Sequence, residues 1–254
     1  MVCESPVQNA RPTKSGCSIS PFSITTQPMP SSSTLERSRL TVVLLTLGLN
    51  VVAVLLLSRV TFSDWRTGLA LNLFDNAVLI LHAMELRDRF MWRLILFGLV
   101  LGFAELPADA WLVAGTGTLD YSIGGGPTIW HTPIWVPLAW EIIAVQFGYI
   151  GTRLIEWRFG WGLLLAGLLG AINSPLYEEM ARQVKWWKYA NCHTLLHTPY
   201  YIILGEFGVV LVLALLARLV RTRNYWWAVL AGVVGGLGIW GCYAGAYWVI
   251  EKLF

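Results

Sequence analysis

Seven apolar runs, each close to twenty residues long, follow one another between residues 40 and 249. A helix needs about 20 mostly apolar residues to cross the ~30 Å hydrocarbon core of a bilayer. The runs lie at residues 40–58, 67–86, 92–114, 134–154, 160–178, 199–219 and 226–249. The sequence therefore predicts an all-α, polytopic bundle of about seven transmembrane helices.

Charge is scarce and lies mainly between these runs. Charged residues make up 13% of the 254-residue chain, whereas soluble domains carry about 25%. The formal net charge of +3 comes with no basic stripe, so the sequence predicts no nucleic-acid partner. The membrane itself is the expected surroundings of this chain.

The first 38 residues differ from the rest because Ser, Thr and Pro cluster there without an apolar period. Ser31-Ser32-Ser33-Thr34 is typical, and such a segment has too little apolar surface to bury. We expect a disordered tail at 1–38 and a transmembrane domain at 39–254. Few acids, together with Arg11 and Lys14, leave an organellar transit peptide open as an alternative to a plain cytoplasmic tail.

Orientation follows from counting Lys and Arg in the short loops, because cytoplasmic loops carry the excess. With the N-terminus inside, ten basic residues flank the inner ends: Arg37, Arg39, Arg87, Arg89, Arg93, Arg153, Arg158, Arg218, Arg221 and Arg223. Six flank the outer ends: Arg59, Arg66, Arg182, Lys185, Lys188 and Lys252. This bias predicts that the N-terminus lies on the inner side of the membrane.

We expect the protein to reside in the bacterial inner (plasma) membrane, with an organellar membrane as the alternative.

Carboxylates occur inside the apolar runs, where each costs roughly 2.5–3.5 kcal/mol even on insertion scales. The predicted topology places several of them at similar depth toward the outer side, so they are expected to share one polar cavity. The candidate catalytic residues are Glu105, Asp109, Glu141 and Glu206. Asp75 near mid-depth and Glu178 at a helix end are expected to line the cavity; Glu178 also fits an interfacial residue paired with Arg182 or Lys185.

Glu105 and Asp109 stand four residues apart, which puts them on one face of a helix. Two carboxyls that close titrate as a coupled pair, and a protonated acid beside an ionised partner suits general acid–base chemistry. Pro107 lies between them and interrupts the local hydrogen-bond ladder. Lipid tolerates such an interruption only where protein or water satisfies the backbone.

Aromatic residues gather in two kinds of position. Trp at run ends, including Trp130, Trp135, Trp157, Trp186 and Trp187, is typical of the interfacial belt. Others lie deeper or beside the acids. The candidate substrate-binding residues are Asp75, Trp111, Trp140, Tyr177, Glu178, Tyr200 and Tyr201. Aromatic faces stabilise cations by about 0.5–2 kcal/mol each, and they also suit a rigid polyene or simple core packing.

Metal and cofactor motifs are missing from the sequence. The four cysteines form no C-x-x-C pair, and His193 and His197 lie in a loop near Cys192. No P-loop, H-E-x-x-H or nucleophile elbow occurs. The sequence predicts neither a metal nor a cofactor.

Two segments resemble a known family. The first runs from Gly124-Gly125-Gly126-Pro127 to the stretch Thr132-Pro133-Ile134-Trp135-Val136-Pro137-Leu138-Ala139-Trp140. The second combines Pro175, Glu178 and Ala181 with Trp186-Trp187, Tyr189 and Thr198-Pro199-Tyr200-Tyr201. Both are similar to segments of the membrane carotenoid-biosynthesis proteins that include the carotenoid 1,2-hydratases. The resemblance implies a helical membrane fold and a hydrophobic substrate, and it transfers no catalytic residue.

Together these features favour a membrane enzyme that modifies a polyprenoid or carotenoid-like lipid by acid-initiated hydration or cyclisation. Glu105 or Glu141 would donate the proton, and Asp109 would tune that proton or act on water. Two alternatives remain open: a proton- or cation-coupled transporter, and a non-catalytic subunit that binds pigment or a partner protein. The expected partner is a hydrophobic lipid or polyene. The sequence does not determine the oligomeric state.

Overall fold

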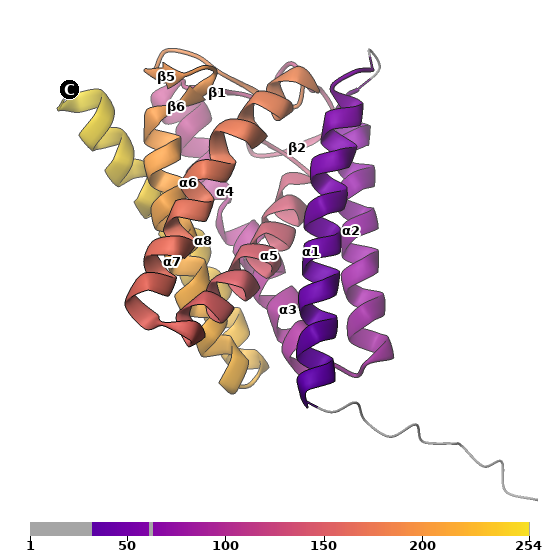
Figure 1. The fold of residues 1–254 in the computed structure, drawn as a ribbon. Coiled ribbons are helices and arrows are strands. Elements are labelled where there is room, and N and C mark those ends of the chain that lie inside the picture. Colours follow the sequence, from indigo (N-terminus) through magenta and orange to yellow (C-terminus); the bar gives the residue numbers. More distant parts are fainter. Residues whose placement is uncertain (1–31, 61–62, 254) are drawn as a thin grey trace, which may run out of the picture.

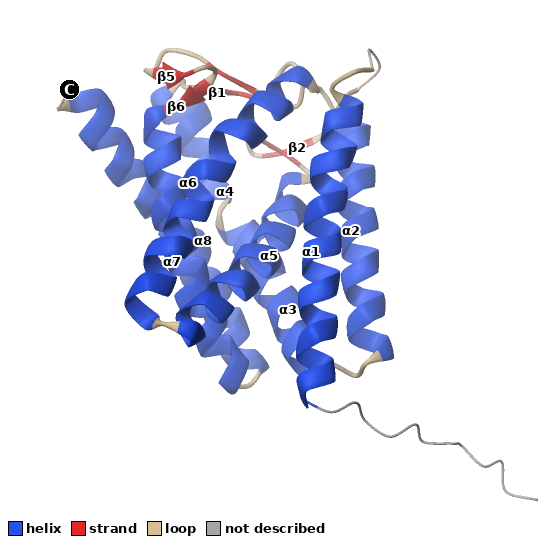
Figure 2. Ribbon diagram, in the orientation of Figure 1, coloured by secondary structure: helices blue, strands red, loops and turns tan. Residues whose placement is uncertain are grey.

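The computed structural model describes residues 32–60 and 63–253 of the chain, so most of the predicted tail lies outside the described residues. Helices run back and forth between two ends of one bundle, which confirms the all-α prediction (Figures 1 and 2). The α-helices are α1 (Ser32–Leu57), α2 (Trp65–Glu85), α3 (Arg89–Ala104), α4 (Leu106–Ala110), α5 (Val136–Trp157), α6 (Phe159–Gln183), α7 (Tyr200–Thr222) and α8 (Tyr225–Tyr247). Two π-helical segments, η1 (Trp111–Thr116) and η2 (Trp248–Lys252), follow α4 and α8.

Six helical segments in the described part of the chain are long and apolar enough to cross a membrane. They are Ser33–Leu57, Trp65–Glu85, Arg89–Thr116, Phe159–Gln183, Tyr200–Thr222 and Tyr225–Lys252. Their outward surfaces carry large apolar side chains, for example Leu56, Ile172 and Val234, each more than half exposed. Exposed aliphatic surface on this scale requires lipid around it, so the chain is a membrane protein.

The seventh predicted span, α5, differs from the other long helices because most of its residues are buried. It packs against α3, α6 and α7 and runs diagonally through the bundle (Figure 1). A helix enclosed by protein needs no apolar surface facing lipid. For this reason α5 can carry Gln146, Glu141 and Tyr149, and it is the long helix that is not among the six candidate spans.

Helix α1 begins at Ser32, ahead of the predicted boundary at residue 38. Its first turns are held by ion pairs that we call the Arg39 clamp: Glu36, Arg39, Asp88 and Arg221. Arg39 binds both carboxylate oxygens of Asp88 at 2.6 Å, and Arg221 reaches Glu36 at 3.0 Å. Ser and Thr content does not reveal these long-range pairs, and the helix begins inside the segment that was predicted as a tail.

The predicted span at 92–114 is interrupted where Pro107 was expected to loosen it. Helix α3 ends at Ala104, Glu105 occupies the junction, and α4 restarts with Pro107 in its first turn. Proline has no N–H to donate and fits the start of a helix. The backbone then widens into the π-helix η1. Glu105 therefore stands at a junction inside the span Arg89–Thr116, and Asp109 follows it in α4.

Small residues let α8 approach α3 closely. A Cβ at Gly232 would lie 2.8 Å from the carbonyl oxygen of Phe97, and one at Gly236 would lie 2.5 Å from the backbone of Ala104. Gly232 and Gly236 stand four residues apart in α8, as do Gly241 and Gly245. A Cβ at Gly241 or at Gly245 would have no atom within 4 Å. Only the first of the two glycine pairs therefore serves packing within the described chain.

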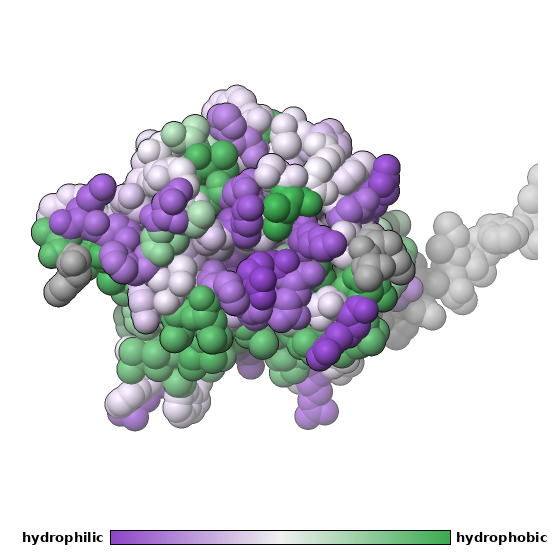
Figure 3. Space-filling model, turned by 90° about the horizontal axis from the view of Figure 1, so that it is seen from above, coloured by the Kyte–Doolittle hydropathy of each residue, from purple (hydrophilic) through white to green (hydrophobic). Residues whose placement is uncertain are grey.

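Two loop segments, residues 117–135 and 184–199, cover one end of the bundle, and we call them the capping loops. They form three two-stranded antiparallel sheets: β1 (Leu119–Asp120) with β4 (Lys188–Tyr189), β2 (Thr128–Ile129) with β3 (Thr132–Pro133), and β5 (Thr194–Leu195) with β6 (Thr198–Pro199). Seen onto this end, hydrophilic residues gather at the centre and apolar ones at the lower rim (Figure 3).

Three tryptophans predicted for the interfacial belt lie inside instead. Trp135 and Trp186 are 1% exposed and Trp187 is 9% exposed, with ring centroids 5.1–6.2 Å apart. The indole of Trp186 donates to the Asp64 carbonyl and approaches the Thr67 hydroxyl, both at 3.2 Å. The cluster thus joins the capping loops to α2. Trp130 and others at run ends are exposed, as a belt requires.

Candidate functional site

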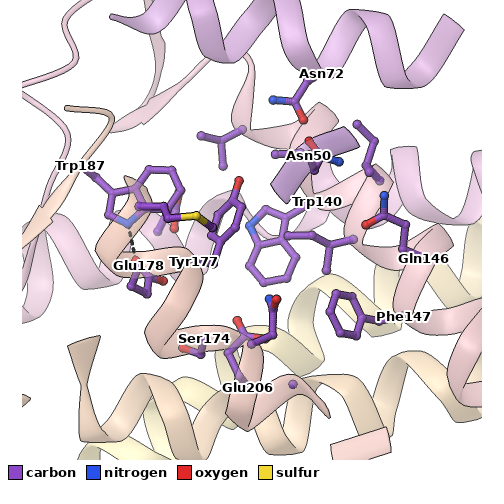
Figure 4. A pocket seen from close by; sticks show the side chains of 18 of the residues that line it. Asn50, Asn72, Trp140, Gln146, Phe147, Ser174, Tyr177, Glu178, Trp187 and Glu206 are labelled. Atoms are coloured by element: carbon purple, nitrogen blue, oxygen red, sulfur yellow. Dashed lines mark hydrogen bonds between the residues drawn. The ribbon is translucent and has the colours of Figure 1, made fainter. Parts of the chain in front are cut away.

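An internal cavity opens between α1, α2, α5 and α6 beneath the capping loops. The centre of a water molecule can occupy about 110 Å³ of it, whereas one water needs only about 10–15 Å³. The cavity is therefore large enough for several waters or for part of a ligand. Trp140 and Tyr177 stand in its middle, between groups of polar side chains from different helices (Figure 4).

Three carboxylates line this cavity: Asp109 from α4, Glu178 from α6 and Glu206 from α7. Two of them were predicted as catalytic and one as substrate-binding. They come from three separate helices, so only the tertiary structure could unite them. The predicted convergence of acids from several spans is seen for this subset.

Each of these carboxylates accepts a hydrogen bond from an aromatic side chain. Tyr121 Oη donates to Asp109 Oδ2 at 2.7 Å. Trp187 Nε1 donates to Glu178, and Tyr189 Oη donates to the same carboxylate at 3.3 Å. Tyr243 Oη donates to Glu206. Aromatic donors keep apolar bodies toward the cavity while their polar tips satisfy the acids.

Two of these phenols belong to the capping loops and lie outside the spanning segments. Burial first, and then the nearby carboxylates of Asp109 and Glu105, raise the pKa of Tyr121 well above its ordinary value. Burial and Glu178 raise the pKa of Tyr189 in the same way. Both phenols therefore keep their protons at neutral pH and act as donors to the acids.

Glu105 lies directly behind Asp109, at the junction of α3 and α4. It is 0% exposed, and neither carboxylate oxygen has a hydrogen-bond partner among the described residues. Its polar neighbours are Asp109, Trp140 and the more distant Glu206. The predicted Glu105–Asp109 pair is therefore present. Asp109 faces the cavity, and Glu105 lies behind it, away from the cavity.

Two further predicted acids lie away from the cavity lining. Glu141 faces α3, where its own backbone and Cγ contact the position of Gly98, and its Oε1 has no partner in the described chain. Asp75 is fully buried on α2 and neighbours Asn50 and Tyr177. Asp75 therefore supports the cavity wall from behind, whereas Glu141 belongs to the α3–α5 contact.

The predicted aromatic residues divide in the same way. Trp140 and Tyr177 line the cavity. Trp111 and Tyr201 instead pack edge-on against Tyr247, with centroids 5.4 and 5.3 Å apart. Tyr200 is 45% exposed and lines a shallow apolar groove on the outside of the bundle.

Uncharged polar residues in the cavity wall escaped the sequence reasoning. Asn50 on α1, Asn72 on α2 and Gln146 on α5 face the cavity, as does Ser174 on α6. In the view of Figure 4, Trp140 separates the three amides from Glu178 and Glu206, whereas Ser174 lies beside Glu206. The signal that could have found them is an amide in the middle of an apolar run, which is costly in lipid for the same reason as an acid.

Among the described residues, the cavity wall contains no basic side chain and no group of side chains arranged to bind a metal ion. The residues around the cavity include neither Lys nor Arg. Across 32–60 and 63–253, no group of three His, Cys, Asp or Glu side chains is arranged to hold a metal ion. His193 and His197 pair with Glu251 and Glu179 at the surface.

Comparison with known proteins identifies one family. The family described as a domain of unknown function, DUF6989, matches residues 106–250. The match contains all three cavity carboxylates, and it leaves out Glu105 and the amide-bearing helices α1 and α2. No curated protein and no solved structure matches the chain. Because the match covers more than half of its length, the chain belongs to the DUF6989 family.

Proposed function

We propose that this protein is a membrane enzyme that modifies an isoprenoid lipid by acid-initiated hydration or cyclisation, with its N-terminus on the cytoplasmic side of a plasma membrane. The observation that carries the proposal is the cavity itself. Asp109, Glu178 and Glu206 meet there beside aromatic walls, inside a bundle surrounded by lipid. The resemblance of residues 124–140 and 175–201 to carotenoid-biosynthesis proteins supports the same substrate class.

In the proposed reaction Asp109 donates a proton to a carbon–carbon double bond of the substrate. The bond's electron pair forms the new C–H bond, and the neighbouring carbon becomes a carbocation. Trp140 and Tyr177 stabilise this cation through their ring faces. In hydration, a water oxygen then bonds to the cation and its proton passes to a carboxylate. In cyclisation, a second double bond attacks the cation, and a proton is lost from carbon.

The surroundings of Asp109 suit this role. After Asp109 has lost its proton, the 2.7 Å hydrogen bond from Tyr121 stabilises the resulting carboxylate. Glu105 stands next to Asp109 and is shielded from the cavity, so it can return a proton without contacting the substrate. Glu178 and Glu206 remain as acceptors for the proton released at the end. General acid–base groups of this kind contribute about 10²–10⁴-fold to rate.

The test uses two neighbouring carboxylates with different surroundings. Glu178 lines the cavity, whereas Glu179 points outward to Arg182, Gln183 and His197. The purified protein in proteoliposomes is incubated with acyclic polyenes, and the products are followed by chromatography and mass. We expect Asp109→Asn and Glu178→Gln to lower product formation at least about 100-fold and Glu179→Gln to leave it unchanged.

Equal loss in Glu178→Gln and Glu179→Gln would contradict a reaction in the cavity, as would full activity of Asp109→Asn. Wild-type protein that produces no hydrated or cyclised product from any polyene would remove the enzymatic proposal. Uptake of a cation into the same proteoliposomes, abolished by Glu206→Gln, would establish the transporter alternative in its place.

A further inference from the structure

The cavity wall has two chemically different sides. Carboxylates and phenols occupy the side formed by α4, α6, α7 and the capping loops. Three of the four lining amides occupy the other side, with Asn50 from α1, Asn72 from α2 and Gln146 from α5 (Figure 4); the fourth, Asn173, comes from α6. Trp140 and Tyr177 lie between the two sides in that view. A molecule that fills this cavity therefore meets carboxyl and phenol groups at one end and mainly amide groups at the other.

The amide side keeps capacity for a ligand. Asn72 uses Nδ2 to reach the Gly68 carbonyl at 2.8 Å, and Gln146 uses Nε2 to reach the Thr46 hydroxyl at 3.1 Å. Each NH₂ group has a second hydrogen to donate and each side-chain oxygen two lone pairs. The Ser174 hydroxyl, on a residue 4% exposed, lines the same cavity without a partner in the described chain.

The charge of the lining limits what can bind. Asp109, Glu178 and Glu206 face the cavity and no Lys or Arg does so among the lining residues. A diphosphate or carboxylate headgroup would lose its hydration and gain no cation to replace it, which is strongly unfavourable in a buried site. Amides and hydroxyls instead match a neutral carbonyl or hydroxyl oxygen, which needs one or two hydrogen bonds.

We propose that the substrate is a neutral, oxygen-bearing isoprenoid whose carbonyl or hydroxyl group binds Asn50, Asn72 and Gln146 while its apolar chain extends past Trp140 toward the carboxylates. This assignment rests on the proposed function for the identity of the chain. It goes further by fixing which end of the molecule is polar, that this end is uncharged, and where in the cavity it sits.

The test compares four ligands that share one fifteen-carbon chain: farnesol, farnesene, farnesyl diphosphate and farnesylamine. Binding to the full-length protein in lipid nanodiscs is measured by quenching of tryptophan fluorescence, with Trp135, Trp140 and Trp187 in the cavity wall as reporters. We expect farnesol to bind about tenfold more tightly than farnesene, and farnesyl diphosphate to bind more weakly than either. Two hydrogen bonds of ordinary strength correspond to such a factor.

Substitutions locate the contact. Asn72→Ala and Gln146→Ala should reduce farnesol affinity about three- to tenfold and leave farnesene affinity unchanged. Asn76→Ala is the matched control, because Asn76 lies one turn along α2, bonds to the Asn72 carbonyl and does not line the cavity. A loss of farnesol affinity in Asn76→Ala as large as that in Asn72→Ala would overturn the assignment.

The proposal also fails if farnesene binds as well as farnesol, if farnesyl diphosphate binds most tightly, or if none of the four ligands binds. Tightest binding by farnesylamine would assign the cavity to organic cations instead. Binding needs no proton transfer, so Glu178→Gln is expected to keep the preference for farnesol. A protein that prefers farnesol but forms no product would refute the proposed reaction and leave the ligand assignment standing.

Discussion

Buried charge is handled in opposite ways at the two ends of the bundle. Asp88 is fully buried, yet it accepts bonds from Arg39 and from the backbone N–H groups of Phe90 and Met91. It therefore caps α3 while forming the Arg39 clamp. Glu105 is equally buried and has no donor among the described residues. The first arrangement stabilises the fold, whereas burying the Glu105 carboxyl without a partner costs stability.

Removing the clamp should destabilise the protein. We expect Arg39→Met to lower the free energy of unfolding by about 3 kcal/mol, because it leaves the Asp88 carboxylate buried without its cation. The measurement is the melting temperature in detergent. Arg66→Met is the control, since Arg66 pairs with Asp64 but its side chain is 73% exposed and such pairs contribute little. Equal destabilisation by the two substitutions would contradict this account of the clamp.

The clamp also predicts how stability depends on pH. Asp88 lies between the spanning segments α2 and α3. Burial tends to raise its pKa, but hydrogen bonds and charge from Arg39 and the backbone N–H groups outweigh it and hold the pKa below the ordinary 3.8. A depressed pKa means that the contribution is complete above about pH 4 and is lost as the pH falls through the folded-state value.

We therefore expect the melting temperature of the wild type to fall as the pH is lowered from about 4 toward about 2, and that of Asp88→Asn to be lower at pH 7 and to change less over the same interval. Parallel curves for the two proteins would show that Asp88 does not couple protonation to folding. Salt should affect the difference only weakly, because the pair is buried.

Helix contacts in this bundle depend on where glycine meets a neighbouring backbone. A Cβ at Gly98 would lie 2.6 Å from the Glu141 carbonyl oxygen, and one at Gly102 would overlap the carbonyl oxygen of Pro137. These two positions bring α3 against the start of α5, where Trp140 enters the cavity wall. In membranes, close backbone approach replaces the hydrophobic effect as the source of helix association.

We expect Gly102→Ala to lower stability by about 1–3 kcal/mol, because the added carbon meets a backbone atom that cannot rotate away. Gly241→Ala is the matched control: it adds the same carbon to α8 with nothing within 4 Å, and it should leave stability unchanged or raise it by up to about 1 kcal/mol. Thermal unfolding of both variants in one detergent checks this. Equal effects would show that the α3–α5 contact adapts more readily than its geometry implies.

At the scale of the whole molecule, most of the arginines lie at the end of the bundle opposite the capping loops. The Arg39 clamp, Arg93 and Arg223 mark one end, and the polar face of Figure 3 marks the other. Because the chain crosses the bundle an odd number of times between the start of α1 and the end of η2, these two points lie at opposite ends of the bundle (Figure 1). The excess of arginine at the α1 end predicts that this end is cytoplasmic.

Single cysteines in a background without the four native ones test this orientation. We expect Lys188→Cys in the capping loops to react with a membrane-impermeant maleimide in intact cells of an expression host, and Arg89→Cys to react only after permeabilisation. Both positions are exposed, so reactivity reports sidedness and not burial. The reverse pattern would place the cavity and its capping loops toward the cytoplasm.

Apolar run lengths and the positions of Arg and Pro determined the helical membrane fold and the interruption at Pro107, because crossing a bilayer is a local requirement on about 20 consecutive residues. Only the tertiary structure decided which side chains share the cavity. Glu178 and Glu179 are adjacent in the chain, yet one lines the cavity and the other bonds to surface residues. Helix rotation and the contacts made by distant loops set that difference, and so the burial of Trp135 and the role of Asn72 lay beyond any local pattern.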